Sequence, residues 1–193
     1  NIRQCVPGLF WAIFAGCAAI TGAFSNVGWV CAPPVDAYEC EDFNVNNPLL
    51  LSVLVGIILE GRITLIGLDQ PYGGCNKPNR ACFEASATLS KAMVRTSGHV
   101  YWLSPKTTGN LSDPTRASYL DSLGFCSAFD SCRFGTPWIL RANLYSTYSG
   151  ISRLGALCDG CSNYVSLQSS SPCGKKWALI ANQVWPRCAD AIA

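Results

Sequence analysis

The cysteine content constrains this chain more than any other feature of its sequence. Twelve cysteines are distributed along 193 residues, and their number is even. They are Cys5, Cys17, Cys31, Cys40, Cys75, Cys82, Cys126, Cys132, Cys158, Cys161, Cys173 and Cys188. The chain has one histidine, and only Cys158 and Cys161 have the C-x-x-C spacing of a zinc knuckle, so no metal site is expected. The pattern favours disulfide bridges, each contributing about 2–4 kcal/mol.

A chain stapled by disulfides belongs in an oxidising compartment. We therefore expect a secreted or lumenal protein. The triplet Asn110-Leu111-Ser112 is a glycosylation sequon and agrees with secretion.

Length and composition favour a single folding unit over residues 1–193. Hydrophobic residues make up 49% of the chain and charged residues 13%, which argues against disorder. The net charge is +2, and the lysines and arginines are scattered rather than clustered. This charge pattern argues against a nucleic-acid partner.

Two apolar stretches, residues 6–24 and 48–59, are long enough to raise the question of a membrane span. The first contains a proline and three glycines, and Cys5 precedes it without a basic region. A buried core segment is therefore favoured over a membrane span or a cleaved signal peptide. The same interpretation applies to the second stretch.

The first half of the chain is predicted to be mainly helical, over residues 1–98. Residues 6–30 are predicted to be helical and apolar. Periodicity leaves residues 49–60 open between a helix and a buried strand. Residues 81–97 have the helix formers and apolar spacing of an amphipathic helix, which Gly98 ends.

The second half, residues 99–193, is predicted to be an α/β part with a short parallel sheet. Residues 99–104 and 152–158 are predicted strands. Residues 113–126 are a predicted helix with Asp113 as the cap and Pro114 in the first turn, and 136–148 is a second predicted helix. The expected fold class is therefore α/β or α+β, with a helical N-terminal subdomain and disulfide staples.

Few residues offer catalytic chemistry. His99 is the single histidine, there is no G-x-S-x-G sequence, and no glycine-rich phosphate-binding fingerprint occurs. No pair of carboxylates can be placed at one site. Trp102 and Trp138 could form walls for a flat or cationic ligand, or could both be core residues.

Five segments, which follow one another along the chain, resemble ADP-ribosyl cyclases over about residues 80–182. NLSDPTRASYLDSLGFC (110–126) is similar to the family's T-L-E-D-T-L-x-G-Y segment, and Leu111, Asp113, Leu123 and Cys126 fall on family positions. VYWLS (100–104), PWILRANLYSTY (137–148) and RLGALCDG (153–160) resemble the segments around it. The loop containing CGKKWALIAN (173–182) resembles the family's F-G-x-x-E-(L/V)-x-N-L loop.

The resemblance implies cleavage of the nicotinamide–ribose bond of NAD, giving cyclic ADP-ribose or ADP-ribose, with NAD as substrate and no cofactor. It implies that Trp102 and Trp138 form the two aromatic walls of one pocket. Asp113, Ser104 and a serine of the 169–171 loop, Ser171, are expected beside the substrate. The resemblance also suggests a local bridge between Cys126 and Cys132.

This chain departs from the family at two carboxylate positions. Ser112 stands at the glutamate of the T-L-E-D segment, and Ala178 stands at the central catalytic glutamate. An alanine there removes the anion that would stabilise the developing oxocarbenium ion. Either a substitution has inactivated the enzyme, which the retained tryptophans favour, or the chain is a natural non-catalytic relative.

The alternative function is a secreted, disulfide-rich, non-catalytic binding protein or toxin. The two hypotheses differ in one structural expectation. The binding protein would have Trp102 and Trp138 as separate core residues, whereas the enzyme would have both lining one pocket with Ala178.

Overall fold

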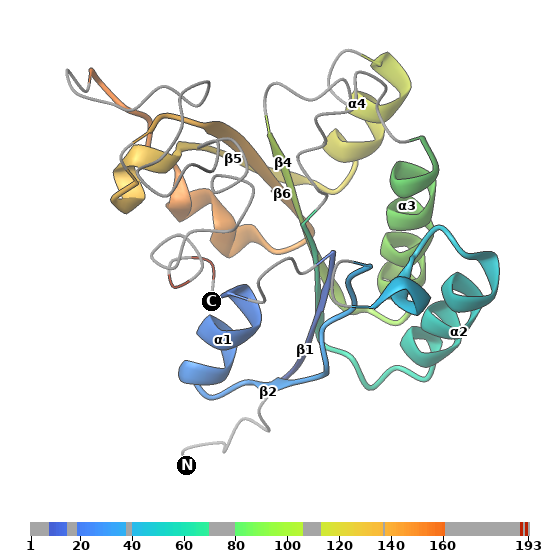
Figure 1. Cartoon of the computed structure of the whole chain (residues 1–193). Coiled ribbons are helices and arrows are strands. Elements are labelled where there is room, and N and C mark those ends of the chain that lie inside the picture. The colour runs from blue at the N-terminus through green and yellow to red at the C-terminus, as the bar shows by residue number, and fades with distance from the viewer. Residues whose placement is uncertain are drawn as a thin grey trace.

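A computed structural model of the chain describes residues 8–14, 19–37, 40–69, 80–105, 113–136 and 138–160, together with residues 190 and 192. These residues form a mixed α/β fold with one six-stranded sheet (Figure 1). The strands are β1 (Leu9–Ile13), β2 (Val30–Cys31), β3 (Leu65–Asp69), β4 (His99–Pro105), β5 (Phe125–Asp130) and β6 (Arg141–Ser146).

The strand order in the sheet is β2-β1-β3-β4-β6-β5. Strands β2, β1, β3 and β4 are parallel, with Ile66 of β3 opposite Trp11 of β1 and Val100 of β4. Strand β6 is antiparallel to both of its neighbours, β4 and β5. The described sheet is thus a parallel sheet with one antiparallel strand near its far edge.

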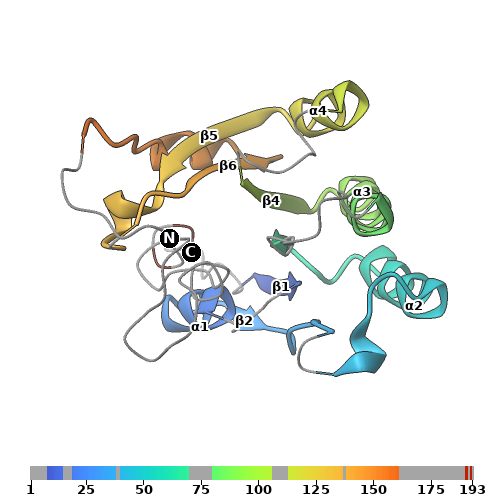
Figure 2. The ribbon, with the colours of Figure 1, turned by 45° about the horizontal axis from the view of Figure 1, so that its top comes forward.

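Helices cover both faces of this sheet. They are α1 (Ala19–Asn26), α2 (Pro48–Leu59), α3 (Arg80–Arg95) and α4 (Pro114–Asp121), with 3₁₀ turns η1 (Glu41–Phe43), η2 (Ser131–Phe134) and η3 (Ser149–Leu154). Figure 2 shows α2, α3 and α4 along one side of the sheet and α1 on the other.

Two hydrophobic clusters fill the space between the sheet and these layers. The larger cluster lies on the α2–α3–α4 face, where Leu68 and Trp102 meet Leu89 and Met93 of α3. The other lies on the α1 face, where Phe10 stacks on Phe24 at 3.9 Å between ring centroids. Because successive residues of a strand point to opposite faces, each inner strand contributes to both clusters.

The prediction of helix over residues 6–30 is wrong, because this segment contains β1, α1 and β2. Four of the five residues of β1 are buried, as expected for a parallel strand covered on both faces. Such a strand has a continuous apolar run, which period alone does not distinguish from a buried helix.

The open choice over residues 49–60 is settled as helix α2. Asn47 caps it by accepting a hydrogen bond from the backbone N–H of Leu49 at 3.0 Å, and Pro48 occupies the first turn. The prediction of helix over 81–97 is confirmed by α3, and that of a strand over 99–104 by β4.

In the second half, the boundaries and one element type differ from prediction. Residues 113–126 form helix α4 and then begin strand β5. The described residues of 136–148 contain no helix: the hydroxyl of Thr136 donates a hydrogen bond to the carbonyl of Trp138, and strand β6 follows. Residues 152–158 contain the end of η3, and only Ala156 pairs with the sheet, opposite Phe129.

The predicted division of the chain is also corrected. Residues 1–98 are not a separate helical part, because they supply β1, β2 and β3 to the sheet that β4 continues. The parallel part of the sheet therefore comes mostly from the first half of the chain. The second half adds the antiparallel pairing.

The predicted disulfide staples find no support among the described cysteines. Six of them lie in the described ranges, and no disulfide joins any two of them; they are Cys31, Cys40, Cys82, Cys126, Cys132 and Cys158. The bridge between Cys126 and Cys132 suggested by the resemblance is therefore wrong. The other cysteines lie outside the described residues.

Within the described part of the chain, no helix has the length and apolar character needed to cross a membrane.

Candidate functional site

The order of the strands reverses direction between β1 and β3. From β1 the chain passes through α1 to β2 on one side, and from β3 it passes through α3 to β4 on the other. Right-handed crossovers in opposite directions place their helices on opposite faces, as observed for α1 and α3 (Figure 2). Open α/β sheets bind ligands outside the carboxyl ends of the strands at such a reversal.

The residue that follows β1 has a strained backbone. Phe14 has a φ of 62°, a left-handed conformation that costs a residue with a side chain roughly 1–2 kcal/mol. It is held there by a hydrogen bond of 2.8 Å from its N–H to the carbonyl of Val35. Strain of this kind concentrates at functional sites, and here it marks the point where the chain leaves β1.

An acidic residue lies beside this point. Asp36, half-buried, directly follows Val35, whose N–H bonds to the carbonyl of Ala12 at 3.0 Å. In dinucleotide-binding sheets, an acid about twenty residues beyond the first strand, near the end of the second, accepts hydrogen bonds from the ribose hydroxyls. Asp36 follows β1 and β2 at a comparable distance.

A second acidic residue ends β3. Asp69 is 8% exposed, and the Tyr101 hydroxyl lies 3.5 Å from its Oδ2. Its Oδ1 is buried and has no hydrogen-bond partner among the described residues. Burial raises the pKa of Asp69 from 3.8 to about 7, against the opposing effect of the Tyr101 hydroxyl. A buried carboxylate oxygen without a partner is expensive to maintain, so this atom is a candidate ligand contact.

The position of Tyr101 depends on Gly67. The two residues are opposite each other in the β3–β4 pairing. A Cβ at Gly67 would lie 2.2 Å from the Tyr101 hydroxyl oxygen. The glycine therefore lets the tyrosine lie across β3 and approach Asp69.

The β5–β6 end of the same rim carries a structural ion pair. Arg141 donates two hydrogen bonds to Asp130, at 2.9 and 2.8 Å, and Asp130 is fully buried. The Asp130 Oδ2 also accepts the N–H of Cys158 at 2.8 Å. The charge of Arg141 is therefore matched within the fold. Asp36 and Asp69 give the described rim at β1–β3 an acidic character.

The structure does not bring Trp102 and Trp138 together. Trp102 is fully buried in the cluster on the α3 face, with its ring 5.1 Å from that of Phe83. Trp138 is buried in the cluster on the α1 face. The prediction that these two residues line one pocket is wrong, since the sheet separates the two clusters.

The other predicted substrate residues have different surroundings. Ser104 is buried near the carboxyl end of β4, so it lies on the same rim as Asp69. Asp113 is the cap of α4: it accepts the N–H of Thr115 at 2.9 Å and pairs with Arg116 at 3.3 Å. Its observed contacts are structural. Ser112, Ser171 and Ala178 lie outside the described residues.

The sequence analysis missed Phe14, Asp36 and Asp69. Asp69 had a recognisable signal, because it ends the apolar run LIGLD (65–69), which β3 confirms as a buried strand. A polar residue at the carboxyl end of such a strand is a candidate ligand contact. Asp36 becomes recognisable only when β1 and β2 are identified as strands.

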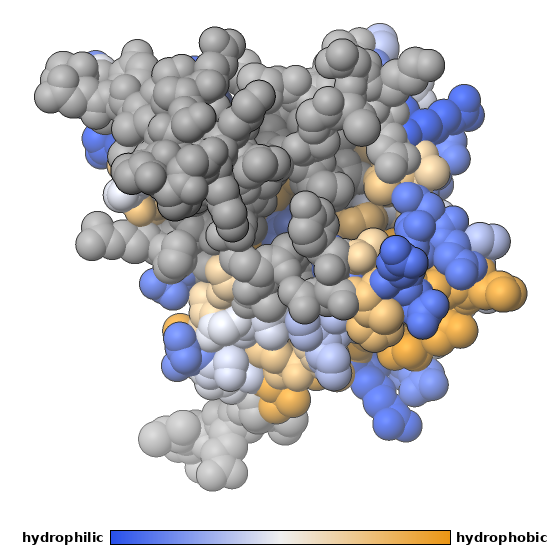
Figure 3. All heavy atoms as spheres, viewed as in Figure 1, coloured by the Kyte–Doolittle hydropathy of each residue, from blue (hydrophilic) through white to orange (hydrophobic). Residues whose placement is uncertain are grey.

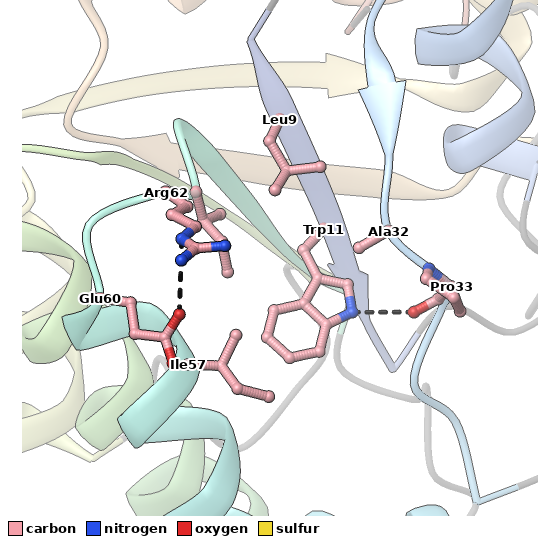
Figure 4. Close-up of a pocket in the computed structure, with 8 residues that line it drawn as sticks. Leu9, Trp11, Ala32, Pro33, Ile57, Glu60 and Arg62 are labelled. Atoms are coloured by element: carbon pink, nitrogen blue, oxygen red, sulfur yellow. Dashed lines mark hydrogen bonds and ion pairs between the residues drawn. The ribbon is translucent and has the colours of Figure 1, made fainter.

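A pocket of about 320 Å³ lies elsewhere, beside the C-terminal end of α2 (Figure 4). Its lining includes Leu9 and Trp11 of β1, and Ile57 and Glu60 at the end of α2. Leu9 begins β1, whereas Asp69 ends β3, so this pocket does not belong to the carboxyl-end rim.

No group of three histidine, cysteine or acidic side chains suited to a metal occurs within the described ranges. The fold and the rim define a doubly wound α/β domain with a candidate ligand site at its strand reversal. No protein-family model and no curated protein matched the chain.

Proposed function

We propose that this domain binds an adenosine-containing, positively charged ligand, S-adenosylmethionine, at the carboxyl ends of β1, β2 and β3. The observation that carries the proposal is the strand reversal with Asp36 and Asp69 on either side of it, where the buried Oδ1 of Asp69 has no hydrogen-bond partner within the described ranges. Asp36 is suited to the ribose hydroxyls. Asp69 offers an acceptor in a buried setting.

The chemistry of the rim favours a ligand without phosphates. A dinucleotide needs a glycine-rich turn that lets the backbone approach its pyrophosphate, and the sequence has no G-x-G-x-x-G pattern. Two acidic side chains would also repel phosphate oxygens. A sulfonium cation would instead be attracted to them.

The sheet supports methyl transfer by analogy of fold. A parallel sheet with one antiparallel strand inserted beside its last parallel strand is also the arrangement of S-adenosylmethionine-dependent methyltransferases. Fold analogy alone does not establish an activity, so the reaction rests on the rim. The ligand would supply an electrophilic methyl group, and Asp69, with its raised pKa, could accept a proton from the acceptor substrate.

Cleavage of NAD remains the prediction drawn from the resemblance to ADP-ribosyl cyclases. Trp102 and Trp138 lie in separate clusters and do not form the two aromatic walls that this prediction requires. Ala178 lies outside the described residues. NAD is therefore the natural comparison ligand in a binding experiment.

The experiment is isothermal titration calorimetry of the chain with S-adenosylmethionine, S-adenosylhomocysteine and NAD. We expect binding of the two adenosyl ligands, and at least a tenfold weaker affinity in Asp36→Asn and Asp69→Asn. Asp42→Asn, at an exposed carboxylate of η1, is the matched control and should bind as the parent does. Binding of NAD alone, or equal affinity in all variants, would overturn the proposal.

A further inference from the structure

Helix α2 has an apolar face that is largely exposed in the described part of the chain. Its outward stripe follows helical spacing, and the large members Leu49, Val53 and Ile57 are 77%, 57% and 40% exposed. Ser52 and Gly56 lie between them on the same stripe. Figure 3 shows the resulting hydrophobic surface at the position of α2.

This face is unusual for a surface helix. A helix on a globular domain normally has polar residues on its outer face, but α2 has no charged residue between Pro48 and Leu59. Only Leu54 and Ile58 of this helix are fully packed into the core. No contact among the described residues therefore accounts for the apolar character of this outer face.

Gly56 points to a partner that approaches this face closely. A glycine inside a helix destabilises it by roughly 0.5–1 kcal/mol relative to alanine. A Cβ at Gly56 would have no atom within 4 Å, so no contact inside the described chain requires a glycine. Small residues on a helix surface allow a second helix to approach.

We propose that α2 packs against α2 of a second copy of the chain, antiparallel, about a twofold axis at Val53. Val53 is central between Leu49 and Ile57. In this register Val53 meets itself, and Leu49 of one copy meets Ile57 of the other. Ser52 and Gly56 form a shallow groove beside these contacts, and their small size lets the two helices approach closely.

The charges at the ends of the helix suit this orientation. The first turn of α2 has no acidic residue to balance the positive end of its dipole, and Glu60 caps the other end. The antiparallel register brings Glu60 of each copy beside the first turn of the other, where a negative charge is favourable. A parallel arrangement would instead bring like ends together.

The pocket at the end of α2 completes the interface. Ile57 and Glu60 belong both to its lining and to the end of the outward stripe. Figure 4 shows Ile57 pointing toward the indole of Trp11, whose Nε1 donates to the carbonyl of Pro33 at 2.8 Å. Leu49 of the second copy, opposite Ile57, would fill this apolar space.

The test is sedimentation velocity on the full 193-residue chain in reducing buffer, from 1 to about 100 µM protein. We expect a dimer whose dissociation constant rises at least tenfold in Val53→Glu and in Gly56→Leu. Gly56→Leu keeps the helix apolar and fills only the groove, so its effect cannot come from lost helix propensity. Circular dichroism should show both variants folded.

Val94→Glu is the matched control, since Val94 is 53% exposed on α3. It should leave the dimer unchanged. A monomer at every concentration, or equal effects of Val53→Glu and Val94→Glu, would overturn the proposal. So would a monomer that floats with phosphatidylcholine vesicles and loses this behaviour in Val53→Glu, since the face would then bind lipid.

Discussion

Replacing Asp69 by asparagine should stabilise the ligand-free protein, although the side chain is buried and lies in the candidate site. Burial raises the pKa of Asp69 from 3.8 to about 7. Between these values the folded state holds a proton that the unfolded state has released. The free energy of unfolding therefore falls as pH rises through this interval.

The size of the effect follows from the shift. A pKa difference of about three units, at 1.36 kcal/mol each, gives about 4 kcal/mol of lost stability above pH 7. An asparagine side chain at this position would resemble the protonated acid and would not ionise. Asp69→Asn should thus match the parent near pH 4 and exceed its stability at pH 8 by up to about 4 kcal/mol.

The assay is urea unfolding of both proteins in reducing buffer at pH 4.5, 6 and 8, followed by circular dichroism. Asp42→Asn is the control, and it should follow the parent at each pH. The reasoning fails if Asp69→Asn is the less stable protein at pH 8, or if both curves fall in parallel. A variant that is more stable yet binds S-adenosylmethionine more weakly would show that the buried acid is kept for its ligand.

Four further substitutions test the structural interpretation by thermal and urea unfolding. Asp130→Ala removes a fully buried carboxylate that accepts two guanidinium hydrogen bonds, and it should lower the free energy of unfolding by about 2–4 kcal/mol. Arg133→Ala breaks an exposed ion pair and should lower it by less than about 0.5 kcal/mol. Gly67→Ala should cost about 1–3 kcal/mol and displace the Tyr101 ring, which a changed tyrosine fluorescence would report. Asp113→Ala should cost about 1 kcal/mol through the lost cap of α4, with unchanged ligand affinity; reduced affinity would restore it to the site.

Sequence reasoning performed best where one local signal determines the element. The amphipathic spacing of α3 and the β-branched and aromatic residues of β4 gave both elements correctly. Asp113 was also identified as a cap from the Asp-Pro pair that begins α4. In each case the residues close in sequence are enough to determine the type of element or the cap.

It failed where the structure depends on partners distant in the sequence. The apolar run containing β1 becomes a strand because β2 and β3 pair with it on both sides. Thr136 and Pro137 match the sequence pattern that begins a helix. The residues that follow form strand β6 instead, because they pair with β4 on one side and with β5 on the other. The resemblance implied one pocket for Trp102 and Trp138, but a linear sequence does not show which face of a sheet each residue occupies.

The strand reversal has a further consequence for the order in which the chain folds. The β5–β6 hairpin pairs Asp130 with Arg141, close in sequence, whereas the β1–β3 seam pairs Phe10 with Leu65, about 55 residues away. Closing a longer loop costs more chain entropy, so we expect the seam to form late and to open early. Amide hydrogen exchange should then be faster at β1 than at β6. A ligand bound across the carboxyl ends of β1 and β3 would slow that exchange, because it would hold together two paired strands that are far apart in the sequence.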